Sequence, residues 1–142
     1  MNNEELCEIL NNIYLLHQLF KKNDFEYEKF NGHRNTSNYY LTLIILKEHG
    51  KLPLSKIGNL MSIKKQSMTY IADILVENGL VMRVPYNDDR RVINLAITNN
   101  GEECLNEWQK ARIKKVNKLF AYFNDEELKK FSFQLKKLVH TL

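Results

Sequence analysis

The chain has 142 residues, of which 44% are hydrophobic, and it carries a formal net charge of +4. This length fits a single domain with a buried core, and the basic charge favours a polyanionic partner. The N-terminal residues, MNNEELCEIL, are acidic and do not resemble a signal peptide, and no run approaches the roughly 20 apolar residues of a membrane span. We therefore expect a cytoplasmic protein that has no membrane partner.

The sequence contains no motif of an enzyme or of a metal site. Cys7 and Cys104 are too few and too isolated for a disulfide framework or a zinc site, and the four histidines are scattered. There is no Gly-rich phosphate loop, no His-Glu-x-x-His motif and no nucleophile elbow. We therefore predict a protein without enzymatic activity, cofactor or metal.

A long first helix is predicted from Glu4 to about Lys22, because leucine and isoleucine recur there at helical spacing and the first turn is acidic. Residues 23–38, NDFEYEKFNGHRNTSN, are polar and contain a glycine and several asparagines. This composition predicts a loop.

A second helix is predicted to begin near Thr36 or Ser37, either of which can cap it, and to end at Gly50. It is apolar almost all round, so we expect it at the centre of the domain. Residues 51–53 then form a short extended piece that can pair with a later hairpin. Residues 54–61 fit one brief helix, and a proline is tolerated in its first turn.

Residues 63–78 contain neither proline nor glycine and have the pattern of an amphipathic helix. The apolar face consists of Met68, Ile71, Ala72 and Leu75. The opposite face carries Lys64, Lys65, Gln66, Thr69, Tyr70 and Asp73. The lysine, glutamine, threonine and tyrosine side chains can donate to phosphates and to base edges, so this face is free to meet a nucleic acid.

A β-hairpin follows this helix. Asn78 and Gly79 provide a left-handed helix stop. The β-rich runs 80–84 and 91–97 are joined by a polar loop at 85–90, and the tip of the hairpin holds two aspartates and two arginines. A helix with a polar outer face followed by a hairpin with a charged tip is the winged form of helix-turn-helix. The predicted fold class is therefore mainly α with a small β-hairpin wing.

Two further helices are predicted after the hairpin. Thr98 is the expected cap of a long helix that runs to Phe123, about 37 Å at 1.5 Å per residue. Asn124 or Asp125 then caps a last amphipathic helix.

The predicted domain organisation has a winged helix-turn-helix core at residues 36–98, with terminal helices at 1–22 and 99–142. These amphipathic terminal helices exceed what is needed to cover the core, so they require another surface for their apolar stripes. A twofold homodimer supplies one, and the alternative is that the helices fold back on their own domain.

The segment NGLVMRVPYNDDRRVINLAITNNG resembles the wing of the MarR family of bacterial transcription regulators. In that family a glycine ends the recognition helix, an Asp-x-Arg motif lies at the wing tip, and a hydrophobic-Thr-x-x-Gly motif opens the next helix. The matching residues here are Gly79, Asp89 with Arg91, and Thr98 with Gly101. The resemblance implies that Arg91 enters the DNA minor groove and that Asp89 orients it.

We accordingly expect a sequence-specific regulator, most simply a repressor, that binds a pseudo-palindromic site on double-stranded DNA as a homodimer. The predicted phosphate contacts are Lys56, Lys64, Lys65 and Arg90. The predicted base contacts are Gln66, Ser67, Thr69 and Tyr70. Asp73 is expected to make a local hydrogen bond rather than to read bases. The alternatives are that Lys64 and Lys65 are ordinary solvated charges and that Tyr70 packs on the edge of the core.

The resemblance also implies an input signal, because a small ligand, often an aromatic acid, shifts the dimer of such regulators between two spacings. The residues that could line its pocket are Tyr14, His17, Tyr39, Tyr40 and Trp108, although aromatic residues at helical spacing are more often core. A redox-sensing regulator of the same fold is an alternative, but Cys7 lies about two helical turns before the position of a sensing cysteine, where Leu15 stands. A winged-helix module that binds another protein is a further alternative.

Overall fold

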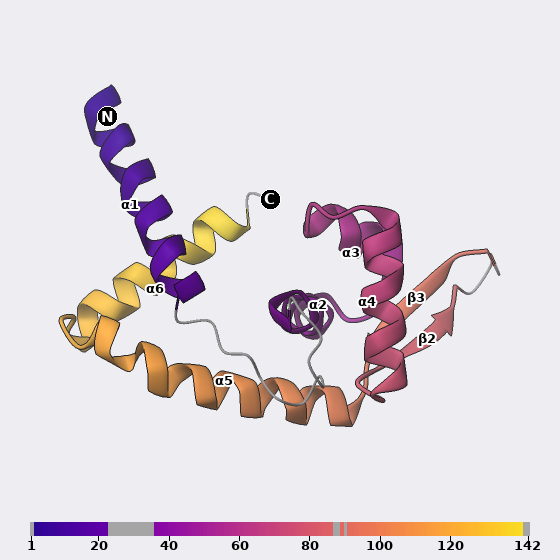
Figure 1. The fold of residues 1–142 in the computed structure, drawn as a ribbon. Helices are drawn as coiled ribbons and strands as arrows, with labels where there is room; N and C mark the ends of the chain where they lie inside the picture. The colour runs from indigo at the N-terminus through magenta and orange to yellow at the C-terminus, as the bar shows by residue number, and fades with distance from the viewer. Residues whose placement is uncertain (1, 23–35, 87–88, 90, 141–142) are drawn as a thin grey trace.

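The structure is a computed structural model that describes residues 2–22, 36–86, 89 and 91–140. These residues form helices and short strands that confirm the predicted fold class (Figure 1). Residues 23–35 of the predicted loop lie outside the described part of the chain. In chain order the elements are α1 (Asn3–Lys22), α2 (Thr36–His49), β1 (Leu52–Pro53), α3 (Leu54–Leu60), α4 (Lys65–Glu77), β2 (Val81–Pro85), β3 (Ile93–Ile97), α5 (Asn99–Phe120) and α6 (Asp125–Val139).

Helix α2 lies at the centre of the core, as its all-round apolar sequence predicts. Its Tyr40, Leu43 and Leu46 are fully buried, and the helix packs against α5, β3 and α4. Figure 1 shows α2 nearly end-on, with α3 and α4 on one side and α5 passing across it. The buried Thr42 hydroxyl donates to the Asn38 carbonyl oxygen at 2.8 Å, so this polar group costs little in the core.

The three described strands form one antiparallel sheet in the order β1-β3-β2. Leu52 of β1 pairs with Leu95, and Val81 of β2 pairs with Ile97, which confirms that the extended piece before α3 joins the hairpin. Strand β3 begins two residues later than predicted. The cause is a turn in which the Val92 amide donates to the Asp89 carbonyl oxygen at 3.1 Å.

The turn between α3 and α4 delays the start of α4. The prediction that this helix begins at Ile63 is wrong by two residues, because Ser62 has a left-handed backbone with φ 54° and Lys64 is extended. The Ile63 amide donates to the Gly58 carbonyl oxygen at 3.0 Å and closes the turn. A non-glycine residue in the left-handed region is strained.

Helix α5 extends away from the core, and α6 turns back from its far end (Figure 1). Helix α5 ends at Phe120, not at the predicted Phe123, and the turn that follows is packed by aromatic rings. The Phe123 and Phe131 rings stack with centroids 6.1 Å apart, and Phe120 lies 6.3 Å from Phe123. Asn124 caps α6 in a reciprocal capping box with Glu127, as predicted for this helix start.

None of the described helices is both long and apolar enough to cross a membrane.

The strain at Ser62 makes a prediction about stability. Ser62→Gly should raise the free energy of unfolding by roughly 0.5 to 1 kcal/mol, because relief of a left-handed residue outweighs the extra chain entropy of glycine. Denaturant titration measures this change. The control Ser132→Gly lies within α6 and should lower stability by about 0.5 kcal/mol. Equal losses in both variants would mean that Ser62 is unstrained.

Candidate nucleic-acid interface

Helix α4 is held in the core by one face and exposes the other. Met68, Ala72 and Leu75 are at most 1% exposed, and Ile71 is buried beside them. Because this buried face fixes the rotation of the helix about its axis, the polar face must point to solvent. The exposed residues of that face and of the preceding cap are Lys64, Lys65, Gln66, Ser67, Thr69, Tyr70 and Asp73.

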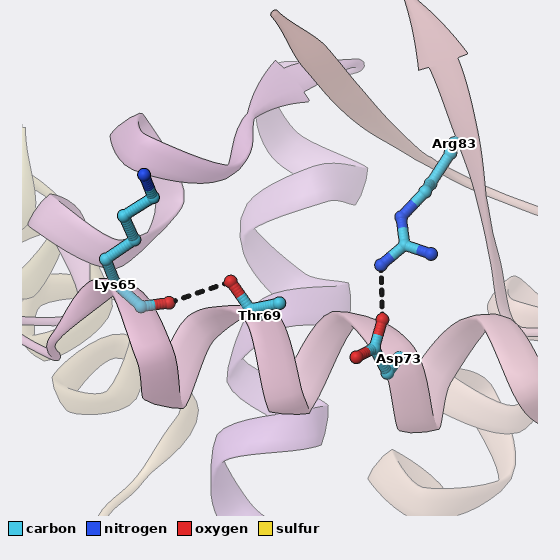
Figure 2. Close-up of polar contacts among 4 residues, drawn as sticks. All are labelled: Lys65, Thr69, Asp73 and Arg83. Carbon is cyan, nitrogen blue, oxygen red and sulfur yellow. Dashed lines mark hydrogen bonds and ion pairs between the residues drawn. The ribbon is translucent and has the colours of Figure 1, made fainter.

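Figure 2 shows Lys65, Thr69 and Asp73 along one edge of α4, each one turn after the last. The Thr69 hydroxyl donates to the Lys65 carbonyl oxygen at 3.0 Å. This local bond occupies the proton of the hydroxyl and leaves the oxygen lone pairs and the methyl group to face outward. Thr69 is therefore suited to accept a hydrogen bond or to contact a thymine methyl group.

Asp73 forms an ion pair with Arg83, which reaches across from β2 (Figure 2). The Asp73 side chain is 56% exposed and that of Arg83 is 39% exposed, so solvent screens the pair and its stability contribution is about 0 to 1 kcal/mol. Its electrostatic effect is local. The guanidinium neutralises the carboxylate that shares an edge of α4 with Lys65 and Thr69, and a bare carboxylate there would repel phosphates.

Arg83 was not among the residues predicted from the sequence. The available signal was a single cation within an otherwise apolar strand, Leu-Val-Met-Arg-Val. Asp73 was expected to make a local hydrogen bond, but its partner lies on β2, ten positions along the chain.

The tip of the wing presents Arg91 beside Asp89. The Arg91 backbone N–H donates to Asp89 Oδ1 at 2.9 Å, and its Nε–H donates to the same oxygen at 3.2 Å. The Arg91 side chain remains 93% exposed, so the outer edge of the guanidinium can meet an external partner. Arg90 lies outside the described residues.

Helix α3 adds a second polar border beside the exposed polar face of α4, which we call the reading face. Lys56 is exposed on α3, as a phosphate contact requires. A hollow of about 250 Å³ lies between α3 and α4, and Ser55, Asn59 and Met68 are among the residues that line it. Ser55 and Asn59 were not predicted, because the sequence alone does not show which face of so short a helix points outward.

Tyr39 and Tyr70 meet where α2 approaches α4. They line a hollow of about 400 Å³ with Gln66 and Ser67. Burial raises the pKa of the Tyr39 phenol, and the charge and hydrogen bond of Tyr70 add to this rise. The rise favours the protonated phenol, which can serve as a hydrogen-bonding group.

The other residues predicted for an effector pocket lie in two places. Tyr40 and Trp108 stack with ring centroids 4.2 Å apart, which joins α2 to α5. The Arg112 guanidinium lies 4.8 Å from the Trp108 ring and 5.8 Å from the Phe20 ring of α1. Tyr14 and His17 of α1 are exposed, whereas Tyr40 and Trp108 are buried and packed together.

The packed pair α3 and α4, followed by a hairpin whose tip carries an oriented arginine, defines a winged helix-turn-helix DNA-binding protein. The MarR family model matches residues 36–93. The chain is 33% identical over 86 residues to the HTH-type transcriptional repressor MdtR of Bacillus subtilis, covering 61% of this chain and 56% of MdtR. It is 27% identical over 114 residues to the transcriptional regulator YpoP of the same organism, covering 80% and 81% of the two chains.

The solved structure of a MarR family protein from Bacillus stearothermophilus superimposes with a TM-score of 0.73 at 25% identity, covering 99% of this chain and 97% of that one. Residues 36–93 therefore form a MarR-family domain, and the chain is a DNA-binding transcription regulator.

The Asp73–Arg83 pair yields a test by double-mutant cycle. Arg83→Met should weaken duplex binding about fivefold, because the bared carboxylate repels phosphates by about 1 kcal/mol. Asp73→Asn combined with Arg83→Met should restore affinity to within twofold of the parent. Fluorescence anisotropy on a duplex selected for binding measures both. A double variant that binds as weakly as Arg83→Met would mean that Arg83 contacts DNA itself.

Proposed function

We propose that this protein is a transcription repressor that binds a pseudo-palindromic operator on double-stranded DNA as a homodimer and acts by binding, without chemistry. The observation that carries the proposal is the exposed polar face of α4 next to a wing whose Arg91 is held by Asp89. A helix of this kind fits the major groove, and an exposed arginine on a narrow ribbon fits the minor groove. We also propose that it acts in the cytoplasm, where a bacterial regulator meets the chromosome.

The proposed contacts divide by chemistry. Phosphate contacts from cationic side chains position the protein and make its affinity fall as salt rises. The residues assigned to phosphates are Lys56, Lys64, Lys65 and Arg90. The residues assigned to base edges are Gln66, Ser67, Thr69 and Tyr70. Arg91 is assigned to the minor groove, where an A·T-rich site deepens the negative potential.

The proposed homodimer is supported by the exposed apolar side chains of the terminal helices. Helix α6 buries no residue, and its large apolar side chains Phe133 and Leu138 are 57% and 60% exposed. On α1 the exposed apolar residues include Leu6, Leu10 and Ile13. Such apolar area is unfavourable in water, and a second copy of the chain would remove it. A twofold dimer would place two α4 helices on half-sites about 10 base pairs apart.

The proposed input is a small aromatic acid bound at the junction of α1, α2 and α5. The stacked Tyr40 and Trp108 rings and the Arg112 guanidinium beside Phe20 support this position. A planar ring that displaced Phe20 would find an aromatic neighbour, and its carboxylate would find a cation. The ligand changes DNA affinity only if it prefers one spacing of the dimer over the other.

The DNA assignment predicts different behaviour for a variant of Arg91 and a variant of Lys64. Arg91→Ala should weaken operator binding by roughly 1 to 3 kcal/mol per subunit, the scale of one good nucleic-acid contact. Lys64→Ala should lower affinity for all sequences alike and reduce the slope of log affinity against log salt. Titrations on operator and unrelated duplex at several salt concentrations measure both effects. If both variants bind like the parent, the surface assigned to DNA is wrong.

The dimer assignment predicts a change of mass in solution. Ile13→Lys places a charge among the exposed apolar residues of α1 and should shift the protein from dimer toward monomer. Asn11→Lys adds the same charge on another side of the helix and should leave the dimer intact. Sedimentation equilibrium distinguishes the two masses. A parent that is already monomeric, or an Ile13→Lys variant as dimeric as the parent, would reject this interface.

A further inference from the structure

Thr98 connects the end of α4 to the beginning of α5. Its hydroxyl donates to the Gly79 carbonyl oxygen at 2.7 Å and accepts from the Gly101 amide at 3.0 Å. Its own backbone amide donates to the Leu80 carbonyl oxygen at 3.0 Å. One residue therefore bonds to the turn that ends α4 and to the first turn of α5, across 19 positions of sequence.

The approach of the two segments is close enough to require glycine. Gly79 has a left-handed φ of 68°, which turns the chain directly after α4. A Cβ atom at Gly101 would lie 2.1 Å from the Leu80 carbonyl oxygen, so only glycine permits this contact without a shift of backbone. The hydrophobic-Thr-x-x-Gly motif thus has a structural purpose beyond capping α5: it brings that helix against the turn after α4.

The hydroxyl satisfies groups at two helix ends. The Gly101 amide has no intrahelical acceptor because it lies in the first turn of α5, and Thr98 supplies that acceptor. On the other side it supplies a donor to the turn after α4. The β2–β3 ladder ends next to this point, where Val81 pairs with Ile97. A rotation of α5 relative to α4 would have to break the Thr98 bonds or carry both helix ends together.

We propose that Thr98 is a positioning residue for DNA binding, which makes the C-terminal end of α4 and the first turn of α5 move as one body. Helix α4 carries the reading face, and α5 leads to the terminal helices assigned to the dimer (Figure 1). Thr98 then transmits a change of dimer spacing to the reading face. This coupling rests on the proposed function for its biological use, but the rigidity of the junction is a property of the free protein.

Three substitutions separate the two bonds of the hydroxyl. Thr98→Ser keeps both. Thr98→Asp keeps an acceptor for the Gly101 amide, and aspartate is a good helix cap, but its carboxylate cannot donate to Gly79. Thr98→Val loses both bonds at nearly the same volume. A matched control is Asn124→Ala, which removes the cap of α6 far along the chain from this junction.

Native-state hydrogen exchange on the free protein tests the junction directly. The reporters are the Leu80 amide, bonded to the Leu75 carbonyl oxygen at 2.9 Å, and the Glu102 amide, bonded to the Thr98 carbonyl oxygen at 3.0 Å. In the parent protein and in the Thr98→Ser and Asn124→Ala variants, exchange of the two amides should show the same denaturant dependence, as expected of one cooperative unit. In Thr98→Asp and Thr98→Val, Leu80 should exchange about fivefold faster and separately from Glu102.

The same variants test the consequence for DNA. Binding of a selected duplex should slow exchange at both Leu80 and Glu102 in the parent and in Thr98→Ser. In Thr98→Asp it should slow Leu80 alone, and duplex affinity should fall about fivefold. Asn124→Ala should lower the melting temperature and leave the joint exchange of Leu80 and Glu102 unchanged.

Joint exchange of Leu80 and Glu102 in Thr98→Asp, equal to that of the parent, would overturn the inference whether or not the protein binds DNA. A parent whose junction exchanges as one unit but which binds no duplex would contradict the proposed function and leave the rigid junction standing.

Discussion

The buried face of α4 is the constraint on which the reading face depends. Met68, Ala72 and Leu75 lie in the core with α2 behind them, and burial of each large apolar side chain contributes about 1.5 to 3 kcal/mol. The exposed Asp73–Arg83 pair contributes less than any one of these. Apolar packing therefore decides which way the helix faces, and polar contacts adjust only the charge of the face that remains outside.

The charge of that face is local rather than global. A net charge of +4 spread over the chain would describe many proteins. Here Asp73 accepts a hydrogen bond from Arg83 on β2, and Asp89 accepts one from Arg91 at the wing tip. Lys65 is exposed along the edge of α4 that carries Asp73 (Figure 2), and Lys64 is exposed directly before the helix. Because both aspartates are paired with arginines, their negative charge does not oppose the attraction of this surface for phosphate. The bond from Asp89 also fixes the orientation of the Arg91 side chain, which is otherwise surrounded by water.

The first half of α5 is built into the core, where Cys104, Leu105 and Trp108 are buried. Helix α5 packs on α2 through Trp108 and meets the turn after α4 through Thr98 and Gly101. Beyond the phenylalanine cluster around Phe120, α6 has no buried residue. Under the proposed regulation, a displacement of α5 would reach α4 through packed contacts such as these.

The sequence by itself determined the features whose causes lie within a few residues. Helical periodicity located α1 and α4, while the capping residues and Gly50 bounded the apolar run of α2. The caps at Thr98 and Asn124 follow from side chains that can bond the next turn, and Gly79 marks the left-handed stop after α4. Only the tertiary structure decided that α4 starts at Lys65 and that Asp73 is paired with Arg83. Those outcomes depend on the close approach of α3, α4 and β2, and the spacing of residues along one element does not encode its distance from another.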